Sequence, residues 1–84
     1  MAAASADPSP FDRLARAERA RRVQAALARL SFEHRAVLLL REVEGLSCEE
    51  IGAALGLAVG TVKSRLSRAR DGLRRGLAAG AVER

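Results

Sequence analysis

Apolar residues recur at helical spacing along most of the chain, and this pattern predicts helices and no strands. The clearest case begins at Val59, where an apolar stripe repeats at intervals of three and four residues. Its members are Val59, Val62, Leu66, Ala69 and Leu73. Such a stripe predicts a helix that holds one face against a core and exposes the residues between the stripe positions.

Another helix is predicted just before this one, from about Cys48 to Leu55. Ser47 and Glu50 form the Ser-x-x-Glu pattern of a capping box, in which each side chain accepts a backbone amide at the helix start. Gly45 suits the left-handed end of a preceding helix. Gly56 ends the predicted helix. Residues 56–58 form so short a connection that the next helix must cross this one at a steep angle.

Three apolar residues of this short helix, Ile51, Ala54 and Leu55, are expected to share one face. Because the connection leaves little slack, we expect this face to pack against Val62 and Leu66. The two helices and their turn together form a helix-turn-helix pattern.

Two further helices are predicted upstream. Ser9 and Pro10 suit the N-cap and the first position of a helix that runs to about Leu30. Ser31 suits the N-cap of a helix from Phe32 to Glu44. The apolar residues that suggest the first of these helices are Phe11, Leu14, Ala15, Val23, Ala26, Leu27 and Leu30, with a break in the pattern near residues 19–22. In the second helix, Val37, Leu38 and Leu40 are expected to provide core.

The predicted fold is therefore all-α: a small four-helix domain with a C-terminal helix-turn-helix, spanning residues 11–77 of an 84-residue chain. Residues 1–10 are small and polar with two prolines, and they are expected to form a flexible tail or linker. Residues 78–84 are rich in Ala and Gly, and a frayed C-terminus is expected there.

The exposed side of the helix from Val59 carries short residues near its start and basic residues at its edges. Gly60, Thr61 and Ser64 would let the backbone approach a flat partner closely. The basic residues are Arg65, Arg68 and Arg70, and arginine can contact phosphates or bridge guanine O6 and N7. A solvated polar face is the simpler interpretation, but the capped helix beside this one favours a DNA-reading helix.

The charge distribution agrees with this interpretation. The chain has a formal net charge of +5, and residues 59–84 hold seven basic and two acidic residues, whereas residues 32–58 hold two basic and five acidic ones. Basic charge therefore collects on the segment expected to bind DNA.

The sequence gives little support for a disulfide, a metal site or a catalytic site. Cys48 is the single cysteine, which excludes an intramolecular disulfide and a cysteine-based zinc site, and His34 stands without catalytic partners. No metal, cofactor or enzymatic activity is expected. The longest apolar run, residues 36–40, is too short for a membrane span, and no signal peptide is visible, so a cytoplasmic location is expected.

The run REVEGLSCEEIGAALGLAVGTVKSRLSRAR, from Arg41 to Arg70, resembles region 4 of bacterial sigma factors, the C-terminal helix-turn-helix domain, and most closely that of the extracytoplasmic-function group. The most specific phrase is GTVKSRLSRAR, and the resemblance covers well over half of the chain. It implies that the second helix of the motif binds the minus-thirty-five element of double-stranded promoter DNA. The positions that match the family's DNA contacts are Arg41, Gly60, Thr61, Lys63, Ser64, Ser67 and Arg68.

The resemblance also implies two protein partners, the beta-subunit flap of RNA polymerase and an anti-sigma factor. The part of a sigma factor that binds the minus-ten element is missing, so the chain is expected to be either a fragment of a longer protein or a stand-alone region 4 protein. The resemblance of residues 1–10 to a variable linker favours the fragment. Two alternatives stay open: the output domain of a LuxR-type response regulator, and a docking module that an anti-sigma factor holds away from DNA.

Overall fold

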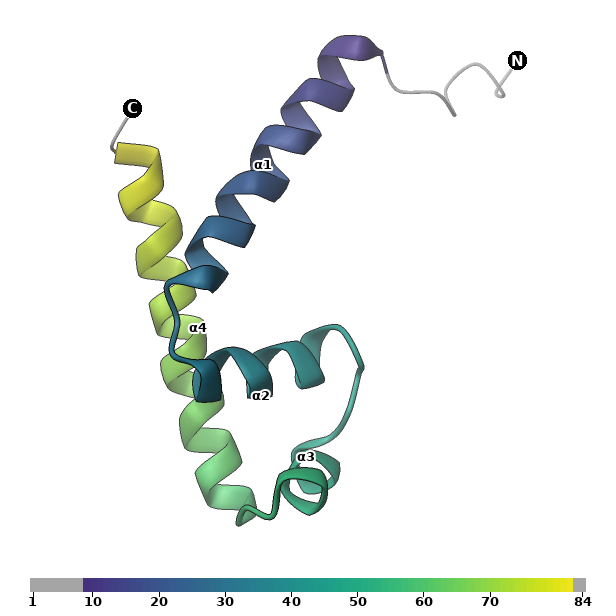
Figure 1. Ribbon diagram of the computed structural model, residues 1–84, viewed down its shortest axis with the longest axis vertical. Coiled ribbons are helices and arrows are strands. Elements are labelled where there is room, and N and C mark those ends of the chain that lie inside the picture. Colours follow the sequence, from purple (N-terminus) through teal and green to yellow (C-terminus); the bar gives the residue numbers. More distant parts are fainter. Residues whose placement is uncertain (1–8, 83–84) are drawn as a thin grey trace, which may run out of the picture.

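The computed structural model describes residues 9–82 and consists of helices joined by short connections (Figure 1). The helices are α1 (Pro10–Ala28), α2 (Phe32–Glu42), α3 (Cys48–Leu55) and α4 (Val59–Val82). Residues 9–82 contain no strand, so the predicted all-α class is confirmed. Of the expected tail over residues 1–10, residues 1–8 lie outside the described part of the chain, as do residues 83–84, whereas Ser9 and Pro10 form the N-cap and the first residue of α1. None of the described helices is both long and apolar enough to cross a membrane.

Serine residues start the first three helices in the way that the sequence predicts. The hydroxyl oxygens of Ser9 and Ser31 accept the amides three residues ahead, at 3.1 and 3.2 Å. At α3 the capping box is complete: the Ser47 hydroxyl accepts the Glu50 amide at 3.0 Å, and the Ser47 amide donates to Glu50 Oε1 at 2.7 Å. These bonds satisfy amides that a helix start leaves without intrahelical partners.

The helix ends differ from the prediction in three places. α1 ends at Ala28 and α2 at Glu42, each two residues before the predicted end. After α1 the chain turns, and Arg35 Nη1 donates to the Leu27 and Leu30 carbonyls at 3.3 and 3.4 Å. α4 continues through Val82, so the predicted end at Leu77 was too early. Packing against α1 and the high helix propensity of Ala account for the extension despite the glycines.

The core forms where α2, α3 and α4 meet. Its buried members are Val37, Leu38, Ile51, Val62, Leu66 and Ala69. Three of these belong to the predicted stripe of α4, and the other two stripe residues, Val59 and Leu73, are half-buried. The stripe is therefore confirmed.

The prediction for the buried face of α3 was wrong in part. Ile51 is fully buried, but Ala54 is exposed and Leu55 is 42% exposed. Leu55 is the last residue of α3, and the chain then turns, so that Leu57 from the turn packs against the core instead. Gly52 is buried together with Ile51, whereas the sequence predicted that Ala54 and Leu55 would share the buried face with Ile51.

The turn between α3 and α4 depends on two glycines. Gly56 has a φ of 71°, in the left-handed region that favours glycine. Gly52 is required for a different reason, because a Cβ built there would lie 2.6 Å from the Leu57 carbonyl oxygen. The Gly52 carbonyl also accepts the Leu57 amide at 2.9 Å. The backbone of α3 thus touches the backbone of the turn directly.

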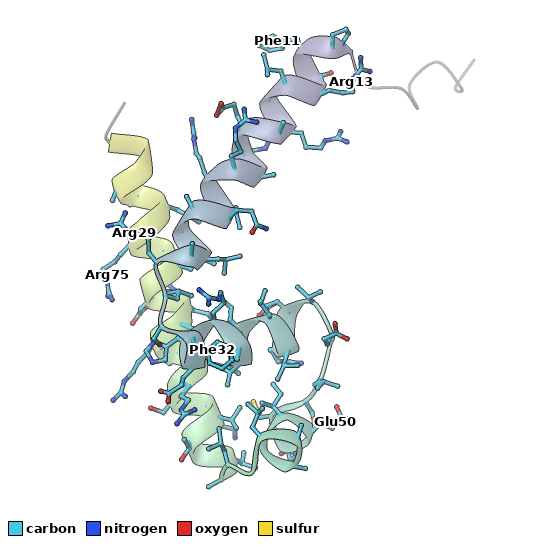
Figure 2. The ribbon with its side chains drawn as sticks, in the orientation of Figure 1. Phe11, Arg13, Arg29, Phe32, Glu50 and Arg75 are labelled. Atoms are coloured by element: carbon cyan, nitrogen blue, oxygen red, sulfur yellow. The ribbon has the colours of Figure 1, made fainter. Side chains whose placement is uncertain are left out.

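α1 packs on the C-terminal half of α4 through its own last turns. A Cβ at Gly76 would lie 3.0 Å from the Ala26 Cβ, so the two helices approach closely there. The other end of α1 extends away from the core, and Phe11 and Leu14 are 77% and 59% exposed (Figure 2). The predicted helix is present, but the apolar residues of its first half lie outside the core, because no other described helix reaches that half.

We expect Gly52→Ala to destabilise the protein by about 1–3 kcal/mol, the usual cost of forcing atoms into a packed site. The neighbouring atom is backbone, so it cannot move aside as a side chain could. Gly60→Ala is the matched control, since a Cβ there meets nothing within 4 Å. That change should stabilise α4 by about 0.5–1 kcal/mol. Urea unfolding of both variants measures the difference, and equal stabilities would show that the contact is not limiting.

Leu66→Ala should cost about 2–5 kcal/mol, from lost transfer energy and the cavity left behind. Leu66 is only 4% exposed, at the centre of the core. Leu55→Ala removes the same atoms from a side chain that is 42% exposed, and should cost only about 0.5 kcal/mol, as surface substitutions do. Thermal unfolding followed by circular dichroism compares the two. A larger loss for Leu55→Ala would mean that α3 is rotated relative to the described packing.

Candidate DNA-binding surface

The exposed side of α4, which we call the α4 outer face, lies opposite the buried stripe. Its members are Gly60, Thr61, Lys63, Ser64, Ser67 and Arg68, and all of them are exposed. The exposure predicted for these residues is confirmed. They lie within the first three turns of α4, directly after the turn that joins it to α3.

The start of the α4 outer face consists of residues with short or polar side chains. Gly60 has open space around its Cα, and Thr61 and Ser64 add only short side chains with hydroxyl groups. The first turn of α4 contains no acidic residue. A flat polar partner such as a groove of DNA could therefore approach the backbone of these turns without electrostatic repulsion from within them.

Arg41 comes to this surface from α2. Its Nη1 donates to the Leu46 carbonyl at 3.0 Å, a bond that ties the side chain to the loop before α3. Arg41 lines a shallow hollow together with Lys63 and Ser67 of α4. The structure thus brings together three of the predicted contact residues from two helices that are distant in the sequence.

Ion pairs occupy part of the basic edge beside this hollow. Arg70 Nη2 lies 2.7 Å from Glu42 Oε2, which joins α4 to the end of α2, and Arg74 Nη1 lies 2.8 Å from Asp71 Oδ1. Both pairs are exposed, so each contributes little to stability. From the sequence, Arg70 was expected to offer donors to phosphates, but in the structure Glu42 already engages its guanidinium.

Arg68 lies on the opposite flank of α4. It lines a second hollow with Arg29 and His34, which the turn after α1 and the start of α2 provide. Arg75 also lines this hollow, and neither Arg29 nor Arg75 was predicted from the sequence as a contact residue. Arg75 follows Arg68 by seven residues, a spacing that puts both on the same side of a helix, so the sequence could have identified Arg75. No local pattern places Arg29 beside α4.

The remaining candidate side chains form no separate chemical site. Cys48 is half-buried at the first position of α3, and His34 is half-buried near the start of α2. Within residues 9–82, no group of three His, Cys, Asp or Glu side chains is placed to hold a metal ion. The polar chemistry that the surface offers is hydrogen bonding and positive charge.

A short helix, a tight glycine turn and a second helix with an exposed polar face define a protein of the helix-turn-helix class. Comparison with known families makes the assignment specific. The family described as "Sigma-70, region 4" matches residues 20–73. The chain belongs to this family.

Individual relatives agree with the family assignment. Over 52 residues, or 62% of this chain and 20% of the relative, the chain is 56% identical to the ECF RNA polymerase sigma factor SigE of Mycolicibacterium smegmatis. It is 47% identical to SigM of Mycobacterium tuberculosis over 64 residues, covering 76% of this chain and 33% of SigM. It is 37% identical to SigW of Bacillus subtilis over 68 residues, covering 81% of this chain and 36% of SigW. The chain thus matches a fifth to about a third of these relatives, and the LuxR-type alternative is not favoured.

The ion pair between Arg70 and Glu42 leads to a prediction about charge at the candidate surface. Glu42→Gln removes a negative charge and releases the Arg70 guanidinium, so binding to duplex DNA at low salt should become a few-fold tighter. Glu33→Gln, at the other end of α2, is the control because Glu33 has no ion pair within the described residues. Fluorescence anisotropy with a labelled duplex compares the variants. Equal gains from both would show that net charge alone matters, and not the release of Arg70.

Proposed function

We propose that this chain is the promoter-reading domain of a sigma factor and that it binds the minus-thirty-five element through the α4 outer face. In this proposal Lys63, Ser64, Ser67 and Arg68 contact base edges in the major groove. Thr61 anchors a phosphate, and Arg41 contacts the DNA at the other edge of the helix. Phosphate contacts position the domain, and base contacts provide the sequence preference.

The observation that carries the proposal is the division of the first turns of α4 into two faces. Val62, Leu66 and Ala69 are almost completely buried, whereas the polar residues between them are exposed. Packing of the buried face fixes the direction in which the polar face points. A helix held in this way can present side chains to a groove without a large ordering cost on binding.

The distribution of charge supports the same partner. Lys63 and Arg68 have no ion-pair partner within residues 9–82, and they stand on opposite edges of the α4 outer face. The two strands of a duplex pass on either side of a helix in the major groove, so a cation at each edge is attracted by both backbones while its side chain reaches the bases between them.

The proposal includes docking on RNA polymerase through its beta-subunit flap. An apolar hollow suited to a protein partner lies on α2, lined by Ala36, Leu39, Leu40, Val43 and Glu44. No residue of α4 lines it, so DNA and polymerase could be bound together. An anti-sigma factor that covered either surface would block the assembly, and we include it as the third proposed partner. The cellular compartment proposed is the cytoplasm, where the polymerase acts.

Selection from a random duplex library tests the proposal. The 84-residue chain should enrich one short sequence motif, and its affinity for that duplex should fall steeply with salt. A log–log slope of about −3 to −6 is expected from the small number of phosphates that one helix can neutralise. No enrichment, or an affinity that does not change with salt, would contradict DNA reading.

Arg68→Ala should weaken binding to the selected duplex by about 1–3 kcal/mol and reduce discrimination at one position, the loss expected for a residue that reads a base. Arg16→Ala, in the exposed first half of α1, removes the same charge away from α4 and serves as the control. Titrations of selected and scrambled duplexes with both variants provide the comparison. If Arg68→Ala weakens both duplexes equally, Arg68 contacts phosphate and not a base.

A further inference from the structure

A basic hollow lies on the flank of α4, where the turn between α1 and α2 passes beside it. We call it the Arg29–Arg75 hollow. Its polar lining consists of Arg29, Ser31, His34, Arg68, Asp71 and Arg75. Figure 2 shows Arg29 and Arg75 projecting on the same side of α4, away from α2 and α3. Segments that are distant in the sequence therefore direct positive charge to one place.

The arginines of this hollow have no ion-pair partner among the described residues. No ion pair or side-chain hydrogen bond engages Arg29, Arg68 or Arg75 within residues 9–82. The carboxylate in the lining, Asp71, is already bound by Arg74 at 2.8 Å. Three guanidinium groups thus share the hollow with one carboxylate that is bound to another arginine, and the planar fork of arginine matches the oxygen atoms of a phosphate.

The serine and the start of α2 add little to this charge. The Ser31 hydroxyl accepts the His34 amide at 3.2 Å, so both of these groups are used in capping α2. An anion in the hollow would therefore be held mainly by arginine side chains.

The hollow is continuous with the α4 outer face. Thr61, Arg68 and Arg75 follow one another at intervals of seven residues, so they lie along one edge of α4 at steps of about 10 Å. A DNA strand that passes Thr61 and Arg68 along this edge would continue toward the hollow. This continuity favours DNA over an acidic protein as the partner of Arg29 and Arg75.

We propose that the Arg29–Arg75 hollow binds backbone phosphates of the DNA strand that flanks the element read by α4. This inference rests on the proposed function and extends it to residues outside the helix-turn-helix. Arg29 and Arg75 would contribute affinity without sequence preference, because phosphates carry no sequence information.

The test compares two double variants that lose the same charge. Arg29→Gln with Arg75→Gln removes both flanking arginines of the hollow, and Arg16→Gln with Arg22→Gln removes two exposed arginines from α1. The DNA is the duplex selected with the unmodified chain, extended on both sides. The first variant should lower the steepness of the salt dependence by about 1–2, since each phosphate contact accounts for about one. Its preference for the selected over a scrambled duplex should not change.

Two further measurements distinguish the loss of phosphate contacts from a folding defect in the variant. Arg29→Lys with Arg75→Lys keeps the charges and should restore most of the salt dependence. The unmodified chain should lose the same steepness on a duplex whose flanking phosphates are replaced by uncharged methylphosphonates. If the glutamine variant titrates like the α1 control while sequence preference persists, the hollow does not bind DNA and only this inference is overturned. If the unmodified chain shows no sequence preference, the proposed function fails as well.

Discussion

The contact between the α3 backbone and the turn that follows it is the constraint on which the rest of the structure depends. Gly52 has no room for a Cβ beside the Leu57 carbonyl, and Gly56 holds the left-handed conformation that turns the chain. Because this connection is so short, it fixes the direction of α4 relative to α3. Ile51 and Leu57 then meet Val62 and Leu66 in the core. The direction of the polar face of α4 follows from this backbone contact.

α4 combines two roles that its periodicity keeps apart. α4 contacts all three other helices, and its apolar stripe supplies half of the buried core, while the residues of its outer face are exposed. If these residues contact DNA as proposed, substitutions at Ser64 or Ser67 will alter recognition without altering the fold, because both side chains are exposed. Gly60 also serves no packing role, because a Cβ there would meet nothing within 4 Å, and glycine lowers the stability of a helix. In the proposed function, its lack of a side chain lets the partner approach the backbone.

The sequence alone predicted the features that depend on near neighbours. The Ser47–Glu50 capping box and the stripe through Val62 and Leu66 are local patterns, and both are present in the structure. The exposed Leu55 and Phe11 could not be predicted, because their burial depends on whether another helix reaches them. The same holds for the candidate surface: its exposed residues on α4 follow from the stripe, but the pairing of Arg70 with Glu42 joins residues that are 28 positions apart.

These pairings make the two edges of α4 electrostatically different. On the edge that faces Arg41, Arg70 and Arg74 are engaged by carboxylates, so the remaining groups there are Lys63 and the hydroxyl of Ser67. The opposite edge keeps Arg68 unpaired within residues 9–82, beside Arg29. Unpaired arginines attract any phosphate backbone, whereas a surface with partly neutralised charge relies more on the fit of individual hydrogen bonds. The acidic residues that α2 and α4 supply to these pairs, Glu42 and Asp71, therefore make the two edges of a single helix differ in unpaired positive charge.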